Sequence, residues 1–297
     1  MKFNKYIISS FVTIVFICVF VFFINKNNNK YVKTEHKIYF NKDYFNVYKY
    51  EPKCNIKKTY IILPSYSYFD ANIWMETKKY VKYEPNKDFE LLTDKLVKNG
   101  NRVIVVEYFG YNNSGETSRK RDSDNICEEI HKVVENFNLN KYILLPHSIS
   151  GLYSLDYLSK YRNEVEGFVG IDITLPYYFL EESESNEEYL KHKFDDNGQK
   201  IPESYKKMYN YFWETSKKLE NFNFENDLPI ILFTSTMLIN SINEQIKKGL
   251  LKTKVIDYLN NRITNKDIQS IKILDGTHYL HKTQSDIMSK NILQNFK

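Results

Sequence analysis

Cysteine is scarce in this sequence, and its scarcity argues against two kinds of protein. The 297-residue chain has three cysteines, Cys18, Cys54 and Cys127, which are too few for a disulfide framework in a domain this large. A single bridge between Cys54 and Cys127 is possible but not indicated. No paired Cys/His spacing suggests zinc. We therefore expect no metal and a fold held together by its hydrophobic core.

Arginine clusters and glycine-rich phosphate loops are also missing. The formal net charge is +5, but the lysines are scattered and there is no arginine-rich stripe, zinc-finger or helix-turn-helix spacing; nucleic acid is therefore not an expected partner. The absence of a Gly-x-Gly-x-x-Gly or Gly-x4-Gly-Lys loop disfavours an enzyme that binds dinucleotides or phosphates. Ala71 is the only alanine, which indicates mutational bias toward A and T, so the Tyr and Lys totals carry no functional information.

The N-terminal segment is the longest apolar run of the chain. Residues 6–24 contain no charge, glycine or proline. As a helix rising about 1.5 Å per residue, they would span the roughly 30 Å hydrocarbon core of a bilayer. A cleaved signal peptide is the main alternative, but no small-residue cleavage site follows. We predict a tail and transmembrane anchor over 1–26, with the short tail cytoplasmic and a catalytic domain outside the cytoplasm.

Beyond a polar linker expected at 27–36, apolar runs alternate with amphipathic stretches. This alternation predicts an α/β domain over 37–297 with a mostly parallel central sheet and helices on both faces. An aromatic and Glu-rich stretch at about 174–227 has no strand signal and is expected to be a helical cap insert. The predicted strands are Lys37–Phe40, Asn46–Tyr50, Tyr60–Leu63, Arg102–Val106, Tyr142–Leu145, Phe168–Ile171, Pro229–Phe233 and Ile271–Leu274.

One segment carries a candidate nucleophile. The predicted strand at Tyr142–Leu145 runs into Pro146-His147-Ser148-Ile149-Ser150-Gly151 and then directly into a helix. A strand-to-helix turn of this kind exposes a strained serine, and the residues two positions to either side must be small. Pro146 and Ser150 stand where the usual Gly-x-Ser-x-Gly motif has glycines, and both are compact.

The chain resembles the α/β-hydrolase superfamily over about residues 37–297, because five motifs occur in that family's order. The serine turn is joined by four others, which resemble the oxyanion strand and loop, a turn of the Asp-x-x-Gly-x-Gly-x-Ser type, the strand after the serine helix, and the loop that delivers the catalytic histidine. These four are Ile62–Tyr66, Val106–Ser114, Gly167–Asp172 and Leu274–Tyr279.

The resemblance implies a role for each candidate residue. Ser148 would attack an acyl carbonyl and His278 would act as the general base. The backbone N–H groups of Ile149 and of the loop at Ser65 or Tyr66 would hold the oxyanion. No cofactor is needed for this chemistry. His147 is expected to pack or bond locally, and His281 to be structural.

The third member of the triad is the least determined by sequence. The family usually places an acid in the loop after the strand at Pro229–Phe233, but no carboxylate stands at that position. Asp172, after the preceding strand, is the first choice, since some family members use that location. Glu244, Asn240 or no third member are the alternatives, and Asp172 could equally be a packing and turn residue.

The function expected from these features is that of a membrane-anchored serine hydrolase. Its substrate would be a small acyl ester, thioester or amide, and the anchor at residues 6–24 makes lipid-like substrates plausible. The cap aromatics could line an acyl pocket or form the core of the cap. A catalytically inert scaffold used for binding is the main alternative, and a haloperoxidase-like or perhydrolase use of the same triad is a third.

Overall fold

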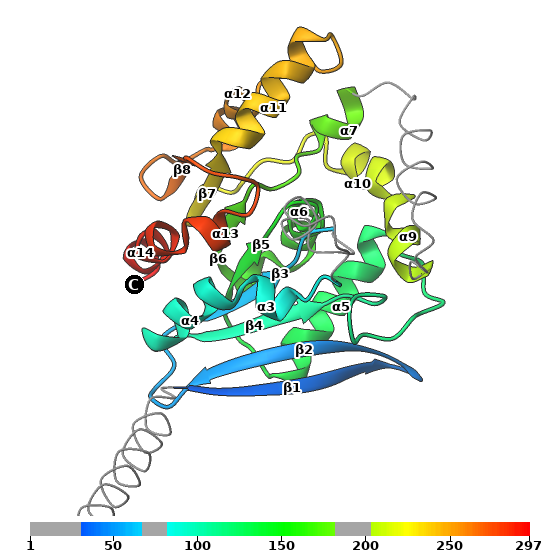
Figure 1. Ribbon diagram of the computed structural model, residues 1–297, viewed down its shortest axis with the longest axis vertical. Coiled ribbons are helices and arrows are strands. Elements are labelled where there is room, and N and C mark those ends of the chain that lie inside the picture. Colours follow the sequence, from blue (N-terminus) through cyan, green and yellow to red (C-terminus); the bar gives the residue numbers. More distant parts are fainter. Residues whose placement is uncertain (1–30, 67–81, 182–202) are drawn as a thin grey trace, which may run out of the picture.

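The computed structural model describes residues 31–66, 82–181 and 203–297, which form one eight-stranded sheet with helices on both faces (Figure 1). The strand order is β1-β2-β4-β3-β5-β6-β7-β8. Strand β2 runs antiparallel to β1 and β4, and the other neighbours are parallel. Every predicted strand is present. The strands are β1 Tyr31–Phe40, β2 Asp43–Pro52, β3 Thr59–Leu63, β4 Arg102–Glu107, β5 Tyr142–Pro146, β6 Val165–Ile171, β7 Ile230–Ser235 and β8 Gln269–Leu274.

Two hydrophobic layers sandwich the sheet. On one face, α4 (Glu90–Lys98) packs against α14 (Ser285–Asn295), and both cover buried side chains of the central strands. On the other face, α5 (Ser123–Asn136) and α6 (Ser150–Tyr161) bury their apolar sides. Every residue of β3 and β5 is buried, because strands covered on both faces read as continuous apolar runs. Short helices α3 (Pro85–Asp88), α12 (Val255–Arg262) and α13 (Leu280–Thr283) complete the described layers.

The prediction of a linker over residues 27–36 is wrong for residues 31–36. Residues 31–36 belong to β1, which pairs with β2 along its whole length. The sequence misled us because β1 is an edge strand with exposed polar side chains such as Lys33 and Glu35, and this polarity resembles that of a linker. The folded domain therefore includes residues 31–36.

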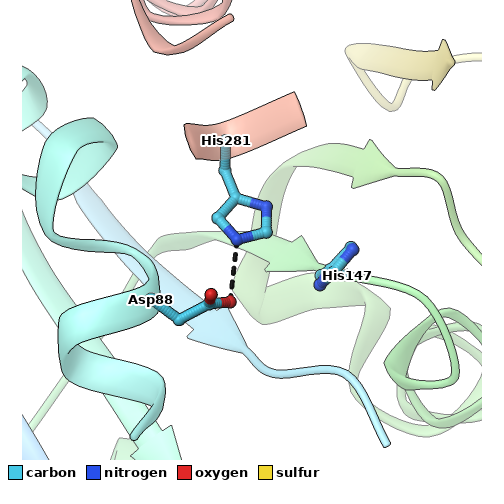
Figure 2. A group of neighbouring side chains, drawn as sticks. All are labelled: Asp88, His147 and His281. Atoms are coloured by element: carbon cyan, nitrogen blue, oxygen red, sulfur yellow. Dashed lines mark hydrogen bonds and ion pairs between the residues drawn. The ribbon is translucent and has the colours of Figure 1, made fainter. Parts of the chain in front are cut away.

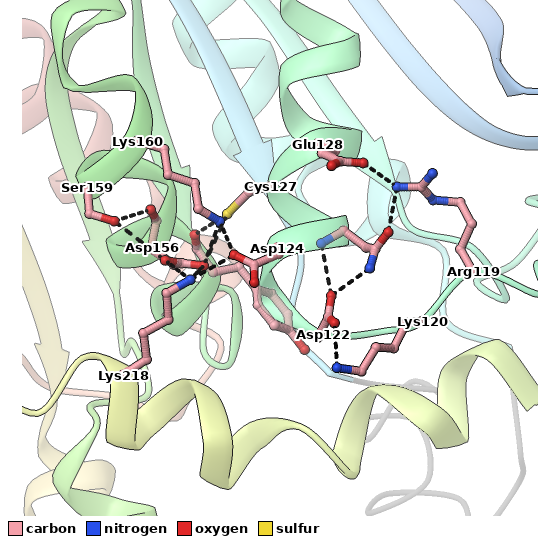
Figure 3. A network of polar contacts seen from close by, with 12 residues as sticks. Arg119, Lys120, Asp122, Asp124, Cys127, Glu128, Asp156, Ser159, Lys160 and Lys218 are labelled. Atoms are coloured by element: carbon pink, nitrogen blue, oxygen red, sulfur yellow. Dashed lines mark hydrogen bonds and ion pairs between the residues drawn. The ribbon is translucent and has the colours of Figure 1, made fainter.

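The insert between β6 and β7 is helical in its described parts, as expected. It contains α7 (Tyr177–Glu181), α9 (Glu203–Tyr209) and α10 (Phe212–Lys218). Lys218, at the end of α10, reaches the carboxylates of Asp124 on α5 and Asp156 on α6, with the Lys218 Nζ–Asp124 Oδ1 distance at 2.7 Å (Figure 3). Asp156 is fully buried, so the cap is fastened to the sheet-covering helices by a partly desolvated ion network.

The predicted transmembrane anchor at residues 6–24 lies outside the described residues and stays a prediction. Across 31–66, 82–181 and 203–297, no helix has the length and apolarity needed to cross a bilayer.

Candidate active site

Ser148 occupies a sharp turn between β5 and α6. Its backbone φ is +57°, a left-handed conformation that costs a non-glycine residue roughly 1–2 kcal/mol. The turn is held on both sides, since Ser148 N–H donates to the Ile171 carbonyl at 3.1 Å and Thr174 N–H donates to the Ser148 carbonyl at 2.8 Å. Strain maintained by such surrounding contacts is typical of functional positions.

The small residues of the turn are needed for two different reasons. A Cβ on Gly151 would lie 2.5 Å from Cβ of Ile173, so only glycine allows α6 to approach the segment after β6 this closely. Ser150 does more than stay small. Its buried hydroxyl donates to the Pro64 carbonyl and lies 3.0 Å from the Tyr108 hydroxyl. Ser150 therefore ties the turn to the segment that follows β3.

His278 and Asp172 are brought together at the carboxyl edge of the sheet. Nδ1 of His278, in the loop after β8, lies 3.3 Å from Oδ2 of Asp172, which follows β6. Asp172 is buried and also has a left-handed backbone, with φ +40°. Ser235, at the end of β7, donates to Asp172 twice: its N–H to Oδ1 at 2.6 Å and its hydroxyl to Oδ2 at 2.5 Å.

The alternative candidates for the third triad residue, Glu244 and Asn240, do not lie beside His278. Glu244 and Asn240 are on α11 (Thr236–Lys247) and line a surface hollow of about 510 Å³. Glu244 is exposed and its carboxylate pairs with Lys247 at 2.6 Å. Neither residue bonds to His278 in the described part of the chain, whereas Asp172 does.

The three residues expected to form the oxyanion hole, Ile149, Ser65 and Tyr66, have different surroundings. The backbone N–H of Ile149, at the N-terminus of α6, has no acceptor among the described residues, as expected of a donor available to a ligand. Ser65 is buried just beyond β3, and its carbonyl accepts from the Tyr111 hydroxyl at 3.0 Å. Tyr66 stacks on Tyr205 of the cap with ring centroids 4.1 Å apart, so its side chain joins the oxyanion segment to the cap.

Ser148 and His278 are connected through His147 rather than directly. The Ser148 hydroxyl makes no hydrogen bond within the described ranges, so the expected Ser148–His278 bond is not formed in this conformation. Instead, Nε2 of His147 lies 2.9 Å from the His278 carbonyl oxygen, and the two rings have centroids 4.7 Å apart. Catalytic hydrogen bonds are often long without substrate and tighten when it binds.

A second His–Asp pair lies beneath this site. Nε2 of His281 on α13 is 2.8 Å from Oδ2 of Asp88 on α3, with His147 beside them (Figure 2). Nζ of Lys282 lies 2.5 Å from the other oxygen of Asp88, and the Tyr83 hydroxyl donates to Oδ2. Burial alone would raise the pKa of Asp88, but His281 and Lys282 outweigh it and hold that pKa well below its usual range.

Asp88, His147 and His281 are the one group within the described ranges whose donor atoms lie close enough together to hold a metal ion. One donor atom each from Asp88, His147 and His281 lies within 4.8 Å of the others. Both Asp88 oxygens are already matched by Nε2 of His281 and Nζ of Lys282. The charge of Asp88 is thus balanced by the chain's own groups, which fits a structural role for His281.

Comparison with solved structures identifies the architecture. The chain superposes on Smu.1393c from Streptococcus mutans with TM-score 0.57, at 14% identity over 89% of this chain and 98% of that one. A Vigna radiata epoxide hydrolase mutant gives 0.59 at 10% identity (88% and 98%), and a haloalkane dehalogenase variant from Bradyrhizobium elkanii gives 0.58 at 7% (89% and 96%). The fold is the α/β-hydrolase fold.

Sequence comparison reaches less far. No family model matches the chain. A 92-residue stretch, 31% of this chain, is 34% identical to uncharacterized protein YbdG of Bacillus subtilis strain 168 and spans 28% of that protein. The chain thus matches less than a third of the length of this curated relative. The structural likeness, at 7–14% identity, shows the fold alone, and the chemistry has to be argued from the site.

Sequence reasoning missed three supporting residues. Ser235 had no signal except its place at the end of a strand neighbouring that of Asp172. Asp88 was not singled out, because nothing in a helical Lys-Asp-Phe sequence indicates that the carboxylate is buried against His281. Ser150 was regarded only as a compact substitute for glycine, and its two hydrogen bonds depend on β3 lying beside β5.

Proposed function

We propose that this chain is a serine hydrolase that cleaves an acyl ester, thioester or amide. Ser148 is the nucleophile, His278 the general base and Asp172 the acid that orients His278. The observation that supports this best is the strained Ser148 turn at the same sheet edge as the His278–Asp172 pair. Nucleophilic catalysis by serine requires a nucleophile, a base and an orienting group close together in space, and three separate chain segments bring these residues to one edge of the sheet.

The proposed reaction proceeds in two acyl-transfer steps. Ser148 Oγ attacks the carbonyl carbon while Nε2 of His278 takes the proton of the Ser148 hydroxyl. The negatively charged oxygen of the resulting tetrahedral intermediate accepts a hydrogen bond from the N–H of Ile149. Collapse of the tetrahedral intermediate breaks the bond to the leaving group, which takes the proton from His278. Water then repeats the sequence on the acyl-enzyme and releases the carboxylic acid. Asp172 stays ionised and holds Nδ1–H of His278.

Fluorophosphonate labelling tests this proposal most directly. The full-length protein in detergent is treated with a fluorescent fluorophosphonate, beside Ser148→Ala and His278→Ala. Labelling of the wild type alone supports the proposal, because phosphonylation requires an activated serine. A folded wild type that does not label would remove Ser148 as the nucleophile.

Two observations favour a catalytically inert scaffold as the second candidate. The Ser148 hydroxyl makes no hydrogen bond to His278 in the described conformation, and serine at position 150 replaces the glycine that usually follows the nucleophile by two residues. An inert protein would bind acyl compounds without turning them over. Burst kinetics with a p-nitrophenyl ester separate the two candidates, since only the hydrolase releases p-nitrophenol stoichiometrically and then continues.

Membrane tethering through residues 6–24, with the domain outside the cytoplasm, is part of the same proposal. A tethered acyl hydrolase would meet lipid-like substrates at the bilayer surface. Cys54 offers a test of orientation, because it is exposed while Cys127 is buried, and both are free. A membrane-impermeant maleimide should label intact cells expressing the wild type but not Cys54→Ser. Labelling only after lysis would place the domain in the cytoplasm.

A further inference from the structure

His147 contacts the catalytic candidates in a way that the proposed mechanism does not use. The side chain is fully buried and is surrounded by the rings of Phe89, His278, Tyr279 and His281, with centroids 4.6–5.9 Å from its own. Burying an imidazole costs more free energy than burying an apolar ring unless its nitrogens form hydrogen bonds. The hydrogen bonds of His147 therefore need to be identified.

The bond that His147 makes determines its protonation. Its Nε2 faces the carbonyl oxygen of His278 at 2.9 Å. A carbonyl only accepts, so Nε2 must carry the hydrogen. Nδ1 of His147 has no hydrogen-bond partner among the described residues, and burial, with the neighbouring His281 and His278, lowers the pKa of His147 well below its ordinary value. The ring is therefore neutral, and its tautomer is fixed by its single bond.

This bond is also the one that holds the backbone at His278. In the described part of the chain, no other hydrogen bond reaches the N–H or carbonyl of His278. Flanking bonds fix the loop earlier, where Gly276 N–H donates to Thr236 Oγ1 at 3.2 Å, and later, where Lys282 N–H donates to the Tyr279 carbonyl at 2.9 Å. Because His147 precedes Ser148 directly, the bond ties the base to the nucleophile's own turn.

We infer that His147 is a positioning residue for the reaction proposed above, setting the distance between Ser148 and His278 through its Nε2–H bond to the His278 carbonyl. The His147 ring packs against the ring of His281. His281 is itself held by Asp88, whose negative charge Lys282 also neutralises. His147 touches neither substrate nor the transferred proton. Its loss should leave both catalytic side chains present but misplaced, and misplacement by about 1 Å can cost on the order of 100-fold in rate.

A glutamine/asparagine pair separates positioning from general packing. The side-chain amide of glutamine extends as far as Nε2 of histidine, whereas that of asparagine reaches only as far as Nδ1. His147→Gln should therefore keep the bond, while His147→Asn buries a similar amide that cannot reach the carbonyl. The full-length protein in detergent is used, with His131→Asn on α5 as the matched control and all rates expressed per folded molecule.

The expected result is a fall of about 30- to 100-fold in fluorophosphonate labelling rate for His147→Asn, with His147→Gln within about fivefold of wild type and His131→Asn unchanged. With a p-nitrophenyl ester, the loss should lie in kcat while KM stays within about twofold. If His147→Asn does not fold, His147→Phe takes its place with the same expectations. Equal rates for the Gln and Asn variants would overturn the inference while leaving the hydrolase intact. A wild type that does not label would overturn the proposed function and this inference with it.

Discussion

Ser235 donates both its N–H and its hydroxyl to the carboxylate of Asp172. Strands β6 and β7 are parallel neighbours, so Asp172, directly after β6, lies beside Ser235 at the end of β7. The α/β-hydrolase resemblance places the acid after the strand that is β7 here. In this chain that strand ends in a serine, which instead holds a carboxylate supplied by β6. The same Ser235 hydroxyl accepts from Leu238 N–H and caps α11.

Replacing Asp172 by Asn should reduce the labelling rate about 10³- to 10⁴-fold, because an amide cannot hold the His278 tautomer or stabilise its charged form. Rates of fluorophosphonate labelling and ester hydrolysis check this. Glu244→Gln, which changes the exposed alternative acid on α11, is the control and should leave the rate unchanged. If Glu244→Gln proves the damaging substitution, the third member has been misassigned.

Ser150→Ala should lower the free energy of unfolding by about 1–2 kcal/mol, since it removes bonds to the Pro64 carbonyl and the Tyr108 hydroxyl. Ser154→Ala is the matched control. It lies one turn later on α6, is equally buried, and its hydroxyl makes no hydrogen bond in the part of the chain that the structure describes, so its effect should stay within about 0.5 kcal/mol. Urea denaturation measures both, and similar losses for the two variants would contradict the role given to Ser150.

Glu107→Gln should stabilise the protein at pH 7 and above but hardly at pH 5. Burial raises the pKa of Glu107 from 4.5 to about 7, and within the described ranges one of its carboxylate oxygens has no hydrogen-bond partner. A raised carboxyl pKa contributes stability below pH 4.5 that is lost as pH rises through 7. The substitution should therefore add about 2 kcal/mol at pH 8 and little at pH 5. The exposed Glu214→Gln should change unfolding little at either pH, and a gain for Glu107→Gln that is equal at both pH values would refute the assignment.

Lys218→Met and Asp156→Asn should be coupled, because the Lys218 Nζ–Asp156 Oδ1 distance is 2.9 Å and the aspartate is fully buried (Figure 3). Lys160 also contacts Asp156, at 3.0 Å, so the loss from Lys218→Met alone should be partial. A double-mutant cycle in urea should give a coupling energy of about 1 kcal/mol. Additive effects would show that the network does not fasten the cap.

Local sequence patterns were enough to predict the strands and the serine turn. Buried parallel strands are continuous apolar runs, as in Tyr142–Leu145, and they stand out whatever surrounds them. The turn at Ser148 is equally local, because a strand that gives way at once to a helix limits the conformations of the residues between. The length of the edge strand β1 was underestimated, because its exposed polar residues have no local pattern that separates them from a linker.

What only the tertiary structure decided is which distant residues meet. Asp172 and His278 are 106 positions apart, and His147 and His278 are 131 apart; each contact depends on the strand order β5-β6-β7-β8. Sequence named Ser148, His278 and Asp172 as candidates and ranked Asp172 ahead of Glu244, but it could not show which of the two carboxylates lies near His278. Parallel pairing brings the ends of β6, β7 and β8 to one edge, where Asp172 lies beside His278, and leaves α11 carrying Glu244 into solvent. Local sequence determined which segments form the buried strands and the serine turn, and the sheet determined which side chains share a site.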